Sequence, residues 1–159
     1  MEAALSNKAH LVDVMCCRGA ASSRTVREFK CSIGWTALMY ACQCGHSKVV
    51  KALLKQECDV ALKEEGTGTT ALMCAARMGH VDVVKTLLLT NQSEPDARNK
   101  QGWTALFFAA AGKHRACVSA LLAFGVRAST KDSCGNNILF YLDKWEGEYM
   151  LKQVKKHCG

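Results

Sequence analysis

The chain has 159 residues, of which 49% are hydrophobic and 22% are charged, and this composition is that of one globular domain large enough to bury a core. The longest apolar run, from Ala105 to Ala111, is shorter than the roughly 18–20 residues of a membrane span, and no secretory signal is visible. We therefore expect a cytoplasmic protein without a membrane partner, and leave association with the cytoskeleton open.

The formal net charge is +7. Proteins that bind nucleic acids concentrate Lys and Arg on one face. Here the basic residues are scattered, and only the stretch around Lys152, Lys155 and Lys156 is dense. Dispersed charges are screened over about 10 Å at 0.1 M salt and do not act as one patch. The charge therefore favours a role in solubility over nucleic-acid recognition.

Three stretches of the chain repeat one another without a gap. They read Gly34-Trp35-Thr36-Ala37-Leu38-Met39, Gly68-Thr69-Thr70-Ala71-Leu72-Met73 and Gly102-Trp103-Thr104-Ala105-Leu106-Phe107. The first glycines are 34 residues apart, and the series continues to Gly135 after 33. Each stretch is followed by paired apolar residues, namely Val49-Val50 with Leu53-Leu54, Val83-Val84 with Leu87-Leu88, and Cys117-Val118 with Leu121-Leu122. A period of this length indicates a repeat protein.

Each unit is predicted to form two short helices. Residues with a capping hydroxyl stand before the first helix of each unit (Thr36, Thr70 and Thr104). Leu38, Ala41 and Cys42 have the spacing of one buried helical face, and Gly45 or Gly79 would end that helix in a left-handed conformation. The histidine that follows (His46, His80 and His114) is expected to close the turn by a local hydrogen bond. Helices this short are unstable alone, so the units must stack.

The unit resembles the ankyrin repeat, whose usual signature is Thr-Pro-Leu-His. The resemblance implies an all-α fold, an ankyrin-repeat solenoid of stacked helix-turn-helix units with β-turn loops. Met39, Met73 and Phe107 stand where the family has a histidine that braces the loop, which implies more apolar contact between units. The Thr-Ala-Leu-Met motif is similar to the repeats of the protein 21.1 family of diplomonad protozoa and to those in the ankyrin tail of NIMA-related kinases.

A single domain over residues 1–159 is predicted to hold five units. Residues 1–30 are expected to form a truncated N-terminal capping repeat, residues 31–64, 65–98 and 99–131 the full repeats, and residues 132–159 a C-terminal capping repeat. In the last unit Asn137 is the predicted N-cap, a second helix is expected over about 148–156, and Trp145 is expected to cover the end.

The cysteine and histidine positions are explained by the repeat, and they do not form a catalytic or metal-binding pattern. The ten cysteines include no Cys-x-x-Cys pair and mostly take helical positions that suit small apolar residues, so we expect reduced thiols. His46, His80 and His114 are a repeat apart, too far to share a zinc ion, and Cys42-x-Cys44-x-His46 lacks the usual spacers. We predict no enzyme, no cofactor and no metal, and keep a thiol-based redox or metal-binding protein as an alternative.

The resemblance implies a scaffold that binds another protein through its concave face and loop tips. Carried over by register, this surface comprises Ser32, Ile33, Trp35, Gln43, Cys44, Thr67, Thr69, Arg77, Met78, Lys100, Gln101, Trp103, Ala111, Gly112, Ser133, Cys134 and Asn136. Trp35 and Trp103 are suited to binding and to packing between hairpins alike. We expect a monomer; the partner is open, as are a kinase's regulatory tail and a self-assembling structural element.

Overall fold

A computed structural model describes residues 34–90 and 92–143, together with 152 and 154. Within these residues the helices are α3 (Ala37–Gln43), α4 (Ser47–Lys55), α5 (Ala71–Met78), α6 (Val81–Leu88), α7 (Ala105–Ala111), α8 (Arg115–Ala123) and α9 (Ile138–Asp143). Lys131 and Asn137 form an isolated antiparallel β-bridge. The predicted all-α class is confirmed.

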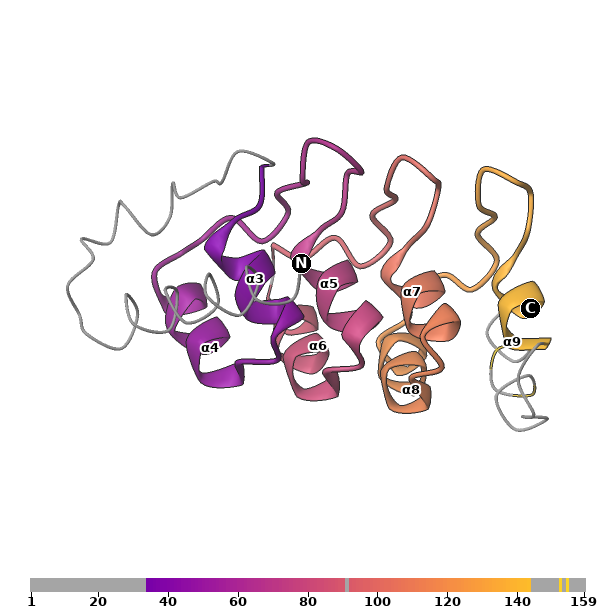
Figure 1. Cartoon of the computed structure of the whole chain (residues 1–159). Helices are drawn as coiled ribbons and strands as arrows, with labels where there is room; N and C mark the ends of the chain where they lie inside the picture. The colour runs from indigo at the N-terminus through magenta and orange to yellow at the C-terminus, as the bar shows by residue number, and fades with distance from the viewer. Residues whose placement is uncertain (1–33, 91, 144–151, 153, 155–159) are drawn as a thin grey trace.

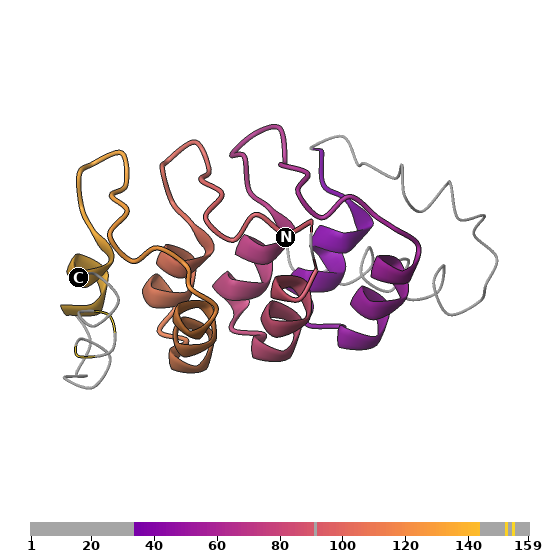
Figure 2. The ribbon, with the colours of Figure 1, turned by 180° about the vertical axis from the view of Figure 1, so that it is seen from behind.

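The helices form two parallel rows (Figure 1). In one row α3 contacts α5, α5 contacts α7 and α7 contacts α9; in the other, α4 contacts α6 and α6 contacts α8. Long loops project from the first row, and the view from behind shows the same stacking (Figure 2). This arrangement is a solenoid in which each unit is stabilised by its neighbours.

The first helices begin at the predicted threonines, but the third does so in a different way. The Oγ1 atom of Thr36 accepts a hydrogen bond from the Met39 N–H at 3.2 Å, and Thr70 accepts one from the Met73 N–H at 3.3 Å. The Met73 sulfur in turn accepts from the Thr70 N–H at 3.5 Å, which completes a capping box. Thr104 makes no such bond, and its buried Oγ1 has no hydrogen-bond partner. Side-chain capping is therefore confirmed at two positions and wrong at Thr104.

The turns between helices need a left-handed residue, although not always at the position predicted. Gly79 ends α5 with φ 79°, as expected. The C-cap of α3 is instead Cys44, and Gly45 takes the left-handed conformation one residue later, with φ 73°. In the third unit Lys113 does so with φ 64°. The left-handed region costs a residue with a Cβ roughly 1–2 kcal/mol, so this turn is strained.

The rings of two histidines in these turns, His80 and His114, make long-range contacts with the preceding unit. The Nε2 atom of His80 lies 3.0 Å from the carbonyl oxygen of Gln43, and His114 Nε2 lies 3.0 Å from that of Arg77. Each ring packs against the glycine of the preceding unit, Gly45 or Gly79. The predicted local hydrogen bond is made by the backbone, since the N–H groups of His80 and His114 donate to the carbonyls of Ala75 and Ala109 at 3.1 and 2.9 Å. The rings add a contact with the preceding unit, because stacking brings the previous helix end close to them.

The first helices are buried on more sides than the sequence pattern predicts. All residues of α3 from Ala37 to Cys42 are buried, not only the face of Leu38, Ala41 and Cys42. The second helices bury one stripe, such as Val49, Val50 and Leu53 in α4. The helix α5, for example, contacts α3, α7 and its own second helix α6, which explains its small residues.

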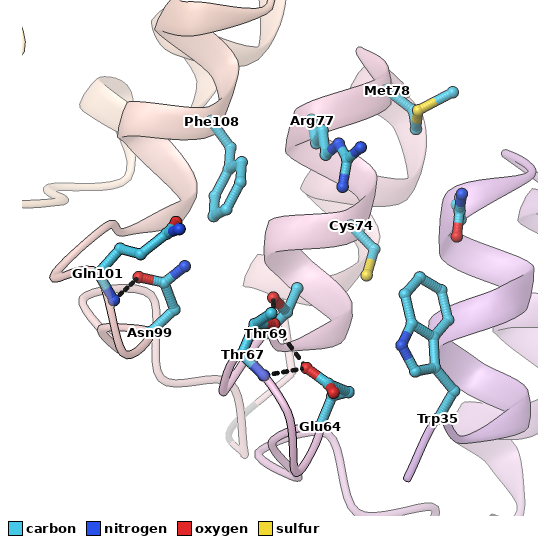
Figure 3. Close-up of a pocket in the computed structure, with 11 residues that line it drawn as sticks. Trp35, Glu64, Thr67, Thr69, Cys74, Arg77, Met78, Asn99, Gln101 and Phe108 are labelled. Carbon is cyan, nitrogen blue, oxygen red and sulfur yellow. Dashed lines mark hydrogen bonds between the residues drawn. The ribbon is translucent and has the colours of Figure 1, made fainter. Parts of the chain in front are cut away.

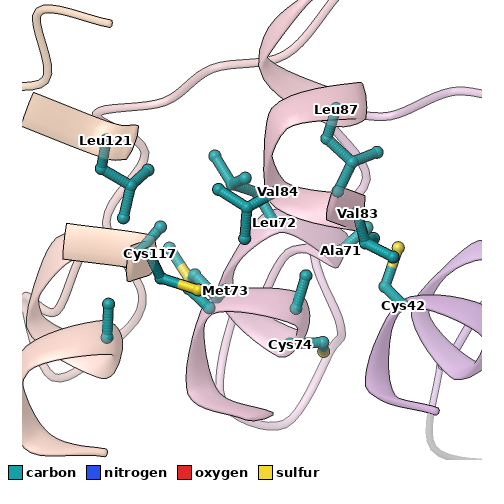
Figure 4. Close-up of a cluster of buried hydrophobic side chains, with 14 of the residues drawn as sticks. Cys42, Ala71, Leu72, Met73, Cys74, Val83, Val84, Leu87, Cys117 and Leu121 are labelled. Atoms are coloured by element: carbon teal, nitrogen blue, oxygen red, sulfur yellow. The ribbon is translucent and has the colours of Figure 1, made fainter. Parts of the chain in front are cut away.

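Cysteines fill part of this core. Cys42, Cys74 and Cys117 are buried free thiols, Cys134 is an exposed free thiol, and the side chain of Cys58 is also buried. Figure 4 shows Cys42, Cys74 and Cys117 among aliphatic side chains such as Leu72, Val83 and Leu121. Their use as small apolar residues is confirmed at these positions.

At the C-terminal end, Asn137 caps α9 as predicted, since its Oδ1 accepts from the Phe140 N–H at 3.3 Å. Lys152 is exposed and Val154 buried, and both are helical, but most of the expected helix over 148–156 lies outside the described residues. The predicted N-terminal cap over 1–30, Trp145, Lys155 and Lys156 also lie outside them. Among the described helices, none has the length and apolarity needed to cross a membrane.

Candidate functional site

A cavity of about 300 Å³ lies between the loops and the first helices of three successive units (Figure 3). Loop and helix residues line it, namely Trp35, Gln43, Glu64, Thr67, Thr69, Cys74, Arg77, Met78, Asn99, Gln101 and Phe108. The cavity therefore depends on the stacking of units and cannot be assigned to one of them.

The cavity brings together seven of the residues that the sequence suggested: Trp35, Gln43, Thr67, Thr69, Arg77, Met78 and Gln101. The other described candidates do not line it: Cys44, Lys100, Trp103, Ala111, Gly112, Ser133, Cys134 and Asn136. Ser32 and Ile33 lie outside the described residues.

Sequence reasoning missed Glu64, Cys74, Asn99 and Phe108. Cys74 and Phe108 each follow the capping threonine by four residues, as Arg77 and Met78 follow theirs by seven and eight. Positions three and four apart share a helical face, so the register would have found these two once Arg77 was chosen. Glu64 and Asn99 each precede the turn, where an acidic or amide side chain typically bonds to the backbone.

The carboxylate of Glu64 is used to hold its own loop. Its Oε1 accepts from the Gly66 N–H, and its Oε2 accepts from the Thr67 N–H at 2.7 Å and from the Thr67 hydroxyl. Burial alone would raise the pKa of Glu64, but these hydrogen bonds outweigh it and hold the pKa below the ordinary value. Glu64 is therefore an ionised structural residue.

The next two loops are built in the same way, with one residue fewer. Asn99 Oδ1 accepts from the N–H groups of Gln101 and Trp103, and Asp132 Oδ1 accepts from those of Cys134 and Asn136. The first loop is longer because Glu64 N–H donates to the carbonyl of Thr69, five residues on, whereas Asn99 N–H donates to Trp103, four residues on. The first loop thus contains one extra residue, in the turn between Gly66 and Gly68.

Neighbouring loops are also joined to one another. The Lys100 N–H donates to the Thr67 carbonyl at 2.8 Å, and the Ser133 N–H donates to the Gln101 carbonyl at 3.0 Å. The Lys100 ammonium bonds to the Glu65 carbonyl at 2.8 Å. These bonds fix the loops as a row, so the wall of the cavity is preorganised.

The two tryptophans have different surroundings. Trp35 is half-buried beside Tyr40, with ring centroids 5.0 Å apart, and its indole also lines the cavity. Trp103 packs against Phe108 and Tyr141, with both centroid distances 5.1 Å, and joins α7 to α9. Packing is observed for both side chains, and a binding role for Trp35 stays a prediction.

Arg77 and Met78 form the end of the cavity nearest the helix turns (Figure 3). Met78 is 46% exposed, which is high for a large apolar side chain. Cys74 lies one helical turn before them and is buried; burial raises its pKa to about 12, although the Arg77 charge opposes the rise. The cavity thus offers one cation, one exposed thioether and a neutral thiol.

Metal and thiol chemistry find no support in this part of the chain. Among the described residues no group of three His, Cys, Asp or Glu side chains could hold a metal ion. Burial raises the pKa of Cys42 well above its ordinary value and that of Cys117 to about 11, so their reactive thiolate forms are disfavoured.

Comparison with known families agrees with the geometry of the stacked units. Residues 1–98 and 86–149 match the family model of ankyrin repeats (three copies), and no curated protein matches the chain. The narrower similarity to protein 21.1 or to a kinase tail has no support from these comparisons. The two matches together cover residues 1–149 of the 159, and the chain belongs to the ankyrin-repeat family.

Proposed function

We propose that this protein is a non-enzymatic scaffold that binds a segment of another protein in the cavity between its loops and first helices. The single observation that carries the proposal is the cavity of about 300 Å³ shared by three units. Ankyrin repeats generally mediate contacts between proteins, and this cavity lies on the side from which the loops project.

The cavity has the properties of a preformed binding site. Its loops are joined by backbone hydrogen bonds and its helices are buried on several sides, so little ordering is needed when a partner arrives. Met78 and the indole of Trp35 supply adaptable and rigid apolar contact respectively, and such residues dominate binding energy in protein interfaces.

The test is affinity purification with the immobilised protein, followed by measurement of the dissociation constant for each purified partner. We expect Trp35→Ala together with Met78→Ala to weaken binding at least about ten-fold, since anchor residues contribute 2 kcal/mol or more. Leu89→Ala is the matched control, because Leu89 is a large apolar residue that is 78% exposed but does not line the cavity.

Partner binding that survives in the folded double variant would reject this cavity as the site. Loss of binding in the Leu89→Ala control alone would move the site to the helices of the second row. Circular dichroism and urea unfolding establish that each variant is folded.

The cellular setting is part of the same proposal. We place the protein in the cytoplasm as a monomer, either a free-standing protein or the regulatory tail of a kinase, with units similar to those of the protein 21.1 family or of the ankyrin tail of a NIMA-related kinase. The Thr-Ala-Leu-Met wording of its units supports this affiliation. Sequencing the full-length transcript tests it, because a kinase domain in the same reading frame would distinguish the tail from the free-standing protein.

A further inference from the structure

The cavity contains a cation that the fold does not need. Arg77 is the one charged residue in α3, α5 and α7, and the positions that match it in the neighbouring units are Gln43 and Ala111. A glutamine and an alanine take the same place in equivalent helices without any change in the stacking. The charge at this position is therefore a property of the surface rather than of the repeat.

The guanidinium of Arg77 is also unused within the described part of the chain, where it makes no hydrogen bond and no ion pair. Other cations of this side are occupied: Lys63 donates to the Arg98 carbonyl, Arg98 to the carbonyls of Gly102 and Lys131, and Lys100 to that of Glu65. The backbone of Arg77 is fixed, because its carbonyl oxygen lies 3.0 Å from His114 Nε2.

The carboxylate that shares the cavity does not neutralise this cation by direct pairing. Glu64 already receives three hydrogen bonds from Gly66 and Thr67 in its own loop. An arginine with an open guanidinium fork is suited to bind a carboxylate through two parallel hydrogen bonds.

A second unused group lies in the same cavity. The side-chain oxygen of Gln43 is buried and has no hydrogen-bond partner. A buried acceptor without a donor is costly, and a ligand N–H would remove that cost. Trp35 and Met78 add apolar contact beside these two polar groups.

We propose that the cavity recognises an extended acidic peptide segment, in which an Asp or Glu carboxylate pairs with Arg77, an N–H group bonds to Gln43, and an adjacent apolar side chain contacts Trp35 and Met78. This inference rests on the proposed function and adds the chemistry of the partner. The charge complementarity is local, since Arg77 is the cation that lines the cavity and the Glu64 carboxylate beside it is engaged by its own loop.

The experiment selects a random library of 12-residue peptides, displayed on phage, against the wild-type protein and against Arg77→Glu. Peptides selected by the wild type carry Asp or Glu at one fixed position beside an apolar residue. Peptides selected by Arg77→Glu carry Lys or Arg at that position instead. Synthetic wild-type-selected peptides bind Arg77→Gln about ten-fold to a hundred-fold more weakly, as expected for a lost charge-assisted pair.

Lys51→Gln is the matched control, because it removes one exposed positive charge from α4, in the other row of helices. It leaves the peptide affinity within about two-fold of the wild type, which separates pairing at Arg77 from the effect of net charge. Arg77 is itself exposed, so its variants retain the fold, and urea unfolding verifies this.

The outcomes separate the two proposals. Selected peptides that lack an acidic residue but depend on Trp35 and Met78 overturn the acidic partner and leave the binding cavity standing. Equal acidic enrichment on the wild type and Arg77→Glu also overturns the role of Arg77. Absence of any peptide whose binding depends on cavity residues overturns both proposals.

Discussion

The Nε2 atom of His80 lies 3.0 Å from the carbonyl oxygen of Gln43, the last residue of the first helix in the preceding unit. His114 repeats this relationship with Arg77. A side chain in the turn of one unit thus satisfies a helix end in the unit before it, where the backbone carbonyls have no partner within the helix.

His80→Ala is expected to lower the free energy of unfolding by about 1–2 kcal/mol, because it leaves the Gln43 carbonyl without its donor. Urea unfolding followed by circular dichroism measures the change. Lys85→Ala, on the exposed side of the same helix, is the control and stays within about 0.5 kcal/mol of the wild type. An equal effect of the two substitutions would contradict the contact.

Thr70 and Thr104 occupy the same position in two units but are expected to respond oppositely to valine. Thr70→Val removes the hydroxyl that accepts a hydrogen bond from the Met73 N–H, and lowers the free energy of unfolding by about 1 kcal/mol. Thr104→Val replaces a buried hydroxyl that has no partner, and leaves stability unchanged or raises it by up to about 1 kcal/mol. Thermal and urea unfolding of the pair test this, and a comparable loss in both would show that Thr104 has a donor or acceptor after all.

Lys113→Gly is expected to stabilise the protein by roughly 0.5–1 kcal/mol. Glycine has no Cβ and relieves the strain of the left-handed conformation, and this gain exceeds the entropic cost of ordering a glycine. Gly79→Ala has the opposite effect, because its added Cβ meets the His114 ring as well as an unfavourable φ. Lys113→Ala keeps the strain and serves as the control; if it stabilises as much as Lys113→Gly, side-chain loss rather than backbone conformation is the cause.

The Tyr141 hydroxyl donates to Asp132 Oδ2 at 2.6 Å, and this bond is the main cause that lowers the pKa of Asp132 from its ordinary 3.8. Because the pKa is lower in the folded state, ionised Asp132 stabilises the fold above pH 3.8, and this contribution is lost as the pH falls through the folded-state pKa. Tyr141→Phe therefore lowers the melting temperature at neutral pH, and the difference from the wild type shrinks towards pH 3.

Asp132→Asn, alone and combined with Tyr141→Phe, is the control for that pH dependence. In the Asn background the effect of Tyr141→Phe no longer varies with pH in the acidic range. A constant difference between Tyr141→Phe and the wild type at every pH would mean that the hydroxyl acts through packing alone.

Thiol labelling distinguishes core cysteines from reactive ones. At pH 8 we expect a maleimide or disulfide reagent to modify the exposed Cys134 quickly, and Cys74 and Cys117 only at the rate of unfolding. Burial and the raised pKa values of about 12 and about 11 both suppress attack. Peptide mapping by mass spectrometry reads each site, with urea-unfolded protein as the reference. Fast labelling of Cys74 in the folded protein would revive the redox alternative.

The repeat and its helices could be predicted from the sequence because the register of Gly34, Gly68 and Gly102 is strict and the helix signals lie close together in the chain. The side-chain partners of His80 and Tyr141 could not be predicted. They are 37 and nine residues away, and no local pattern distinguishes them. The missing cap of Thr104 is likewise invisible, since its sequence setting matches that of Thr36.

For the candidate site, register led to the choice of Trp35, Gln43, Arg77 and Met78, which line one cavity because equivalent positions of stacked units share a face. The register did not reveal that Trp103 packs against Tyr141 in the C-terminal unit. Nor did it show that the Glu64 carboxylate accepts hydrogen bonds from its own loop, because these bonds depend on the conformation of the turn.

The ring contacts of His80 and His114 both run from one unit to the unit before it, and this gives the stack a direction. Unravelling that starts before residue 65 frees the side chain of His80, which can turn into water. Unfolding of residues 99–131 instead removes the His114 ring, and the backbone carbonyl of Arg77 then loses its hydrogen-bond partner. A chain cut back from its C-terminal side would therefore keep Arg77 but leave its carbonyl without the His114 partner, whereas loss of the residues before 65 would remove Trp35, Gln43 and Glu64 from the cavity itself.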